Sequence, residues 1–330
     1  MKKSPQPQKW SFLNQDGNFT LDDPHLINYL YFPLANEDGI LASITPTLGG
    51  DLKLNQHTFF LTPVSAEDLH NSRSTRNFWI YNEAFGPWSA TGNSARQKSE
   101  HFGEEKEQVR LEAGFLWHRL IRENESLGIT SEITSFVPET DQVELMQVKI
   151  TNISKQTLRI TPTAAIPIYG RSADNLRDHR HVTSLLNRIE LTQYGVEVQP
   201  TFFFDERGHK LNKIVYAVLG AEAGGEPPIG FFPVVEEFIG EGGALDWPEA
   251  VVKNRIDFQA EGVNSGGYEA LGGLRFRDAI LEPNASQSYI IILAVVEGPN
   301  HTGALVKKYA NRAAFDSSLS QNQNFWCNKL

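Results

Sequence analysis

Short β-branched runs separated by turn-forming residues constrain this chain more than any other feature. Some of these runs are continuously β-branched and apolar and others alternate apolar with polar residues, and clusters of Gly, Pro, Asn and Asp stand between them. This combination is typical of strands joined by tight turns. The pattern predicts an all-β fold, namely one large antiparallel β-sandwich over residues 15–300. The clearest runs are 132–137, 143–151, 158–163, 213–219 and 289–296.

Two of these runs lie close together in the chain, at 143–151 and 158–163, with a polar stretch between them. Neighbouring strands with a short polar connection commonly form a meander, so we expect these two to pair at the edge of a sheet. No period of 20–50 residues repeats along the chain, which argues against propellers and solenoids. With 330 residues and 40% hydrophobic residues, the chain can bury one large core.

The two ends differ from the middle. After Gly303 the chain loses proline and β-branched residues, and apolar residues recur at helical spacing, as at Leu305 and Tyr309. We therefore expect a helix within residues 301–330, following the sheet domain. Residues 1–14 are expected to be an N-terminal tail. The tail carries charge but no apolar segment of the kind that a secretion signal needs.

Composition argues against several classes of function. Forty acidic residues against 30 basic ones give a net charge of −10, which does not favour binding to nucleic acid. The single cysteine, Cys327, allows neither an internal disulfide framework nor a cysteine zinc cluster. No apolar run is long enough to span a bilayer, so we expect a cytoplasmic protein without a membrane partner.

The segment 171–188 carries four arginines, two histidines and two aspartates between two predicted strands. Long irregular segments inside compact domains are usually functional or disordered, and four apolar residues are expected to hold this one in place. These are Leu176, Val182, Leu185 and Leu186. The central residues could bind an anion, position a sugar or relay a proton, and an ion-pair network that merely holds the loop is the alternative. The candidate site residues are Arg177, Asp178, His179, Arg180 and His181. The two histidines lack an obvious third ligand, so we expect no metal site.

A second candidate segment covers residues 71–89, where arginines and asparagines alternate with aromatic residues. Aromatic rings stack on the apolar faces of sugars, while arginine and asparagine bind hydroxyl groups. The site candidates here are Arg73, Arg76 and Trp88. Trp79 and Tyr81 are expected in the core, whereas Trp88, between Gly-Pro and Ser, is expected nearer the surface.

Two further segments are interpreted as structural. Residues 236–249 contain five carboxylates, but proximity in sequence does not place two of them across a glycosidic bond. We interpret this segment as a solvated glycine-rich loop anchored by Trp247. Residues 266–278 contain four glycines and are expected to allow close backbone approach.

Several of these stretches together resemble glycoside hydrolase family 94, and more narrowly the 1,2-β-oligoglucan phosphorylase group, with cellobiose phosphorylase more distant. The matching stretches cover nearly the whole chain in the family's order. They are 28–54, 63–81 with 86–92, 168–189, 236–251 and 266–281.

The resemblance implies a β-supersandwich of the galactose mutarotase type, then a linker helix, then an (α/α)6 barrel. In the family the barrel holds the general acid and the site for inorganic phosphate, which is a co-substrate and not a cofactor. The resemblance therefore assigns no catalytic residue to this chain, which is expected to be inactive alone. The implied partners are a β-glucan oligosaccharide and a barrel domain, which a separate gene could encode. A stand-alone carbohydrate-binding module and an aldose epimerase using His179 or His181 with a glutamate remain alternatives.

Overall fold

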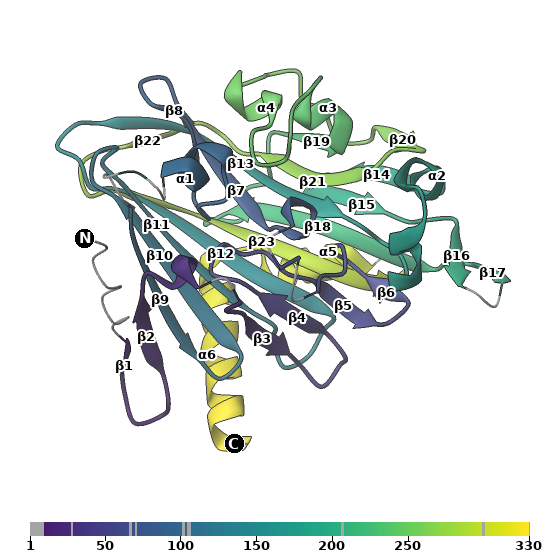
Figure 1. The fold of residues 1–330 in the computed structure, drawn as a ribbon, viewed down its shortest axis with the longest axis horizontal. Helices are drawn as coiled ribbons and strands as arrows, with labels where there is room; N and C mark the ends of the chain where they lie inside the picture. Colours follow the sequence, from purple (N-terminus) through teal and green to yellow (C-terminus); the bar gives the residue numbers. More distant parts are fainter. Residues whose placement is uncertain are drawn as a thin grey trace, which may run out of the picture.

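The fold consists of two packed layers of antiparallel sheet (Figure 1). One layer is an eleven-stranded sheet, and the other contains a six-stranded and a four-stranded sheet. This arrangement confirms the predicted all-β sandwich. The computed structural model describes residues 10–27, 29–65, 68–69, 71–100, 103, 107–205, 208–298 and 301–329.

The eleven-stranded sheet contains most of the strands predicted from alternation. Its central strands are the longest, because they carry the most continuous apolar runs. In order across the sheet, the strands are β1 (Trp10–Phe12), β2 (Phe19–Asp22), β9 (Gln108–Gly114), β10 (Trp117–Asn124), β11 (Ile129–Phe136), β12 (Val143–Asn152), β23 (Ser286–Glu297), β18 (Ile214–Glu222), β15 (Gly195–Val198), β14 (Arg188–Thr192) and β20 (Asn264–Gly266). The first strand lies within the expected tail, so the sheet begins before residue 15.

The second layer is built from shorter strands. In order across the six-stranded sheet these are β19 (Gly230–Val234), β21 (Ala270–Arg275), β13 (Leu158–Ile168), β7 (Asn77–Asn82) and β8 (Gly86–Ser89), with β22 (Ala279–Leu281) also pairing with β13. The four-stranded sheet contains β3 (Phe32–Ala35), β4 (Leu41–Ile44), β5 (Leu52–Asn55) and β6 (Thr58–Phe59). A separate hairpin consists of β16 (Phe202–Asp205) and β17 (Gly208–Leu211).

The predicted pairing of 143–151 with 158–163 is wrong. β12 pairs with β11 and β23, whereas β13 pairs with β7, β21 and β22 in the other layer. The polar connection at 153–157 therefore crosses from one layer to the other. Both strands are buried for most of their length, and a crossing between layers buries them as well as a meander would.

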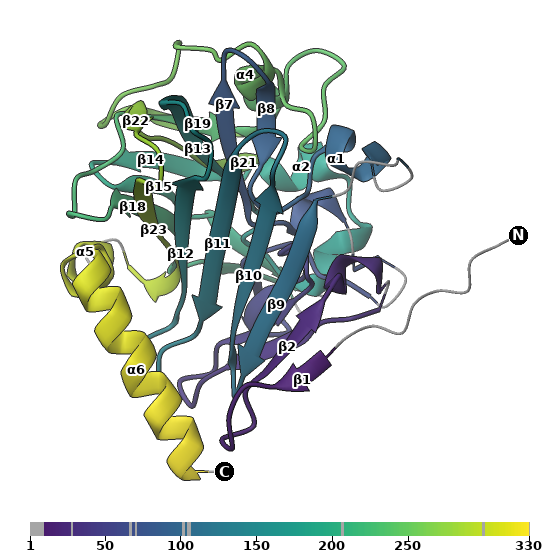
Figure 2. The ribbon, with the colours of Figure 1, turned by 90° about the vertical axis from the view of Figure 1, so that its left-hand side faces the viewer.

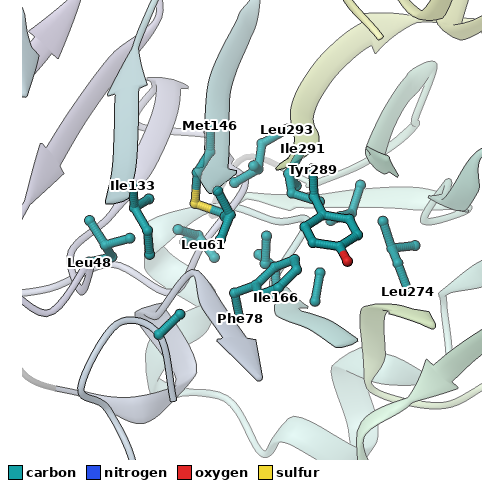
Figure 3. Packing of buried hydrophobic residues seen from close by; sticks show 14 of the residues in the cluster. Leu48, Leu61, Phe78, Ile133, Met146, Ile166, Leu274, Tyr289, Ile291 and Leu293 are labelled. Atoms are coloured by element: carbon teal, nitrogen blue, oxygen red, sulfur yellow. The ribbon is translucent and has the colours of Figure 1, made fainter. Parts of the chain in front are cut away.

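The main core lies between the two layers. It joins Phe78 of β7 and Leu274 of β21 with Met146 of β12 and Ile291 of β23 (Figure 3). Alternate residues of β23 face the opposite way and are equally buried, as Ile292 shows. A strand buried on both faces needs a cover on its outer side as well as its inner side.

Two C-terminal helices provide that cover. α5 (Thr302–Tyr309) and α6 (Arg312–Lys329) place Leu305, Tyr309 and Phe315 against the outer face of the eleven-stranded sheet. Figure 2 shows α6 running along this sheet beside β12. The predicted C-terminal helix is thus present as two helices. Among the described residues, no helix combines the length and apolar character that crossing a membrane requires.

Short helices cover the outer face of the six-stranded sheet. α3 (Val235–Ile239) and α4 (Glu249–Val252) bury Phe238 and Val251 against Trp79, which is fully buried as predicted. The anchoring role predicted for Trp247 is wrong, because this residue is 36% exposed and Leu245 packs into the cluster instead. Glu236 and Glu237 are exposed on α3.

Candidate functional site

One open cleft of about 720 Å³ brings together most of the predicted site residues. We call it the basic cleft. It lies beside α2 (Arg180–Ser184), which is labelled at the upper right of Figure 1, where β13 ends and β21 begins. The predicted site residues that line it are Arg73, Arg177, Asp178, His179, Arg180 and His181.

The segment 171–188 forms two short helices, η3 (Ala173–Arg177) and α2. Ser172 begins the first of them, because its hydroxyl oxygen accepts the backbone N–H of Asp174 at 3.3 Å. His179 lies between the two helices and precedes the first residue of α2. The rings of His179 and His181 lie near each other, with centroids 5.4 Å apart.

Hydrogen bonds of buried polar residues hold this segment. Asn187 is 1% exposed and donates its amide N–H to the carbonyl of Tyr268 at 2.9 Å. Thr183 is also buried and accepts a hydrogen bond from Arg171. The predicted anchors Leu176, Val182 and Leu185 are instead 54%, 60% and 60% exposed. The anchoring prediction is wrong for these three residues, because hydrogen bonds hold the loop and leave their side chains at the surface. The fourth predicted anchor, Leu186, is half-buried.

Glu269 links the two walls of the basic cleft. It precedes β21 and is 7% exposed. Its carboxylate lies 2.5 Å from Nη1 of Arg73, which belongs to the short helix η2 (Ser72–Ser74). The other carboxylate oxygen lies 3.6 Å from Nε of Arg180 in α2. One buried carboxylate thus orients two arginines that are far apart in the sequence.

Arg171 forms the floor of the cleft together with Tyr169. The guanidinium of Arg171 lies 4.7 Å from the centre of the Tyr169 ring and donates to the Tyr169 carbonyl at 2.9 Å. Burial lowers the pKa of Arg171 and raises that of Tyr169. The Tyr169 hydroxyl donates to the carbonyl of Ser172, so the floor is held from both sides.

Arg76 was also predicted to be a site residue, but the structure places it outside the basic cleft. Its side chain is completely buried, and it forms two hydrogen bonds with Glu144 at 2.5 and 2.7 Å. Nη1 and Nη2 also donate to the carbonyls of Gly50 and Asp51, respectively. Each of the three guanidinium nitrogens thus donates inside the core. Arg76 therefore joins the segment that precedes β5 to β12 and cannot contact a ligand from this position.

Trp88 is expected nearer the surface, but its side chain is only 2% exposed. This prediction is therefore wrong. Its indole N–H donates to Glu107 at 2.6 Å, at the wall of a second hollow of about 560 Å³. Burial opposes ionisation of Glu107, but the charge of Arg122 and hydrogen bonds from Trp88 and Asn124 lower its pKa overall. Trp88 thus supports a partly buried carboxylate in a hollow whose lining residues are not those of the basic cleft.

Sequence reasoning does not identify Glu269 and Arg171 as site residues. Glu269 lies in the glycine-rich segment 266–278, which is interpreted as structural. The sequence signal that could have indicated an additional carboxylate partner is the excess of arginines over acidic residues in the segment 171–188. Among the described residues, no group of three or more His, Cys, Asp or Glu is placed to bind a metal ion.

Three comparisons extend these observations. The family described as "Glycosyl hydrolase 94, supersandwich domain" matches residues 44–312. No curated protein sequence matches the chain. Similar solved structures include a bacterial glucoamylase complexed with acarbose, at 6% identity and a TM-score of 0.50. That likeness covers 99% of this chain and 39% of the glucoamylase chain.

Two more solved structures are more distant. A galactose mutarotase-like protein from Clostridium acetobutylicum is 8% identical with a TM-score of 0.40, covering 88% of this chain and 99% of that one. A GH36 alpha-galactosidase from Geobacillus stearothermophilus is 9% identical with a TM-score of 0.33, covering 88% and 41%. At 6% identity the glucoamylase likeness shows the fold alone, and the other two support no argument. The chain spans well under half the length of the glucoamylase chain.

Proposed function

The chain belongs to the glycosyl hydrolase 94 family through its supersandwich domain, and on this premise we propose that the basic cleft is the saccharide-facing wall of an inverting glycoside phosphorylase. The proposed substrate is a β-glucan oligosaccharide, β-1,2-linked in particular, and the second substrate is inorganic phosphate. The general acid and the phosphate site belong, in this proposal, to an (α/α)6 barrel in the same protein or encoded separately.

The convergence of three distant segments on one cleft carries the proposal. Arg73, His179 and Glu269 come from η2, from the segment before α2 and from the start of β21. Arginine, histidine and carboxylate groups bind the hydroxyls of sugars through directed hydrogen bonds. A cleft of about 720 Å³ has the size of a small-molecule site. The side chains are thus suited to holding a sugar ring.

Exposed apolar side chains on the segment 171–188 support a position of the basic cleft beside another domain. Leu176 lines the cleft at 54% exposure, and Val182 and Leu185 are each 60% exposed on the same segment. Several exposed apolar side chains on one segment are typical of a surface that a partner covers. In the proposal this partner is the barrel.

No residue of the sandwich is assigned a catalytic role, and the chain alone is proposed to be inactive. Calorimetric titration with short β-1,2-gluco-oligosaccharides tests its part in binding. We expect heat with the wild type and weaker binding in Arg177→Ala and His179→Ala, with unchanged folding by circular dichroism. Arg159→Ala is the matched control, because Arg159 is an exposed arginine paired with Asp278. Absence of heat at millimolar ligand would contradict the proposal.

Epimerisation of a single sugar is the second candidate, because the cleft brings His179 and His181 together with a glutamate, Glu269. Such a reaction needs an acid and a base on one sugar ring. The carboxylate of Glu269, however, faces the guanidiniums of Arg73 and Arg180. NMR of freshly dissolved α-glucose decides this point. Equilibration at the rate in buffer removes the epimerase candidate, whereas acceleration that His179→Ala abolishes supports it.

A further inference from the structure

The basic cleft has a charge opposite to that of the protein. Its lining contains four arginines and two carboxylates, in a chain whose net charge is −10. The arginines are Arg73, Arg171, Arg177 and Arg180. A concave surface with an excess of one sign of charge concentrates ions of the other sign. The hydroxyls of a neutral saccharide can accept hydrogen bonds from arginine, but they do not require a net positive charge.

The carboxylates of the cleft do not neutralise its arginines completely. Glu269 is shared between Arg73 at 2.5 Å and Arg180 at 3.6 Å. Asp178 accepts the side-chain amide of Asn175 at 2.8 Å. Arg180 is 53% exposed as a side chain, and a guanidinium has five N–H donors, so one contact to Glu269 leaves donors that face solvent.

Aromatic platforms, which neutral sugars use for stacking, are scarce in this cleft. Among the described lining residues the only aromatic ring other than histidine is that of Tyr169, which is 8% exposed and covered by Arg171. Stacking on an open aromatic face contributes much of the apolar contact in neutral sugar sites. The cleft is therefore equipped for charged contacts and poorly equipped for stacking.

We infer that the basic cleft binds a saccharide that carries an anionic substituent, a carboxylate or a phosphate ester. This inference rests on the proposed saccharide-binding function of the same cleft. Arg180 and Arg73, held by Glu269, receive the anionic group, because arginine binds both carboxylate and phosphate with paired N–H donors. The sugar ring lies against His179 and His181.

A matched series of sugars that differ at carbon 6 tests the inference by calorimetry. Glucose, glucuronate and glucose 6-phosphate carry a hydroxyl, a carboxylate and a phosphate at this position, and inorganic phosphate serves as the free ion. We expect at least one acidic sugar to bind about tenfold more tightly than glucose at low salt, the effect of one charge-assisted hydrogen bond. The advantage should decrease as added salt shortens the screening length.

Two variants test whether the preference for an acidic sugar depends on the basic cleft. Arg180→Ala should abolish the advantage of the acidic sugar, whereas Arg159→Ala, which removes an arginine that is 69% exposed elsewhere, should keep it. Retention of the advantage in Arg180→Ala would overturn the inference. The comparison of the three sugars on the unmodified chain does not depend on any variant.

The remaining outcomes separate the inference from the proposed function. Equal binding of glucose and both acidic sugars overturns the inference, and binding of the neutral β-1,2-gluco-oligosaccharide then leaves the proposed function standing. Inorganic phosphate that binds as tightly as glucose 6-phosphate, with no advantage for glucuronate, also overturns the inference, because the sugar is then not recognised. Binding of no saccharide, neutral or acidic, overturns both.

Discussion

The buried pair of Arg76 and Glu144 gives a prediction that separates structural from ligand-binding arginines. Both side chains are completely buried, and the guanidinium also donates to the carbonyls of Gly50 and Asp51, just before β5. Replacing Arg76 by Met keeps an apolar stem of similar length but leaves the carboxylate of Glu144 without its partner. Removal of one partner of a buried pair costs about 3–5 kcal/mol.

We therefore expect Arg76→Met to lower the free energy of unfolding by about 3–5 kcal/mol in urea titration at neutral pH. The double variant Arg76→Met with Glu144→Met should recover part of this loss, because it leaves no unpaired charge. Arg159→Met is the control. Its pair with Asp278 has side chains 69% and 46% exposed, so the loss should be below about 1 kcal/mol.

Two results would refute this reasoning. A loss below about 1 kcal/mol in Arg76→Met would mean that the pair contributes no more than a surface pair. Unchanged stability with a selective loss of saccharide binding would return Arg76 to the binding site, where the sequence alone had placed it.

Two other predictions follow from buried groups. Burial, with the charge of Arg76, holds the pKa of His118 at about 3, against 6.5 ordinarily. His118 therefore becomes protonated in the unfolded chain as the pH falls below 6.5, whereas in the folded chain it stays neutral down to about pH 3. Stability should fall by up to about 1.4 kcal/mol per pH unit in this window. Urea titrations at several pH values should show that His118→Leu lacks this slope and that the exposed control His57→Gln keeps it; equal slopes would contradict the assignment. Phe315→Ala should cost about 3–5 kcal/mol, because Phe315 is fully buried against Phe136 with ring centroids 5.2 Å apart. The exposed neighbour Gln321→Ala should cost little in the same titration, and an equal effect of the two substitutions would mean that α6 does not dock through Phe315.

The strands were predictable because their alternation is local. The run at 289–296, for example, lies within β23 as predicted. The layer to which each strand belongs was not predictable. The polar connection at 153–157 has the same composition whether it joins neighbours in one sheet or crosses between sheets.

Whether a single side chain reaches the site was likewise not predictable from the local sequence. Arg73 and Arg76 are three residues apart and look alike in sequence, yet one lines the basic cleft and the other is buried. Arg73 is held by Glu269, which lies 196 residues away in the sequence, and Arg76 is held by Glu144, which lies 68 residues away. Trp88 likewise is buried because its indole N–H meets Glu107. Such distant partners have no signature in the local sequence.

A crystal structure of the chain with a bound β-1,2-gluco-oligosaccharide would show directly which surface binds the saccharide. We expect the sugar to lie in the basic cleft, with hydroxyls within hydrogen-bonding distance of Arg73, Arg177 or His179. A sugar bound instead in the hollow beside Trp88 and Glu107, with the basic cleft empty, would contradict the assignment of the basic cleft as the saccharide-facing wall.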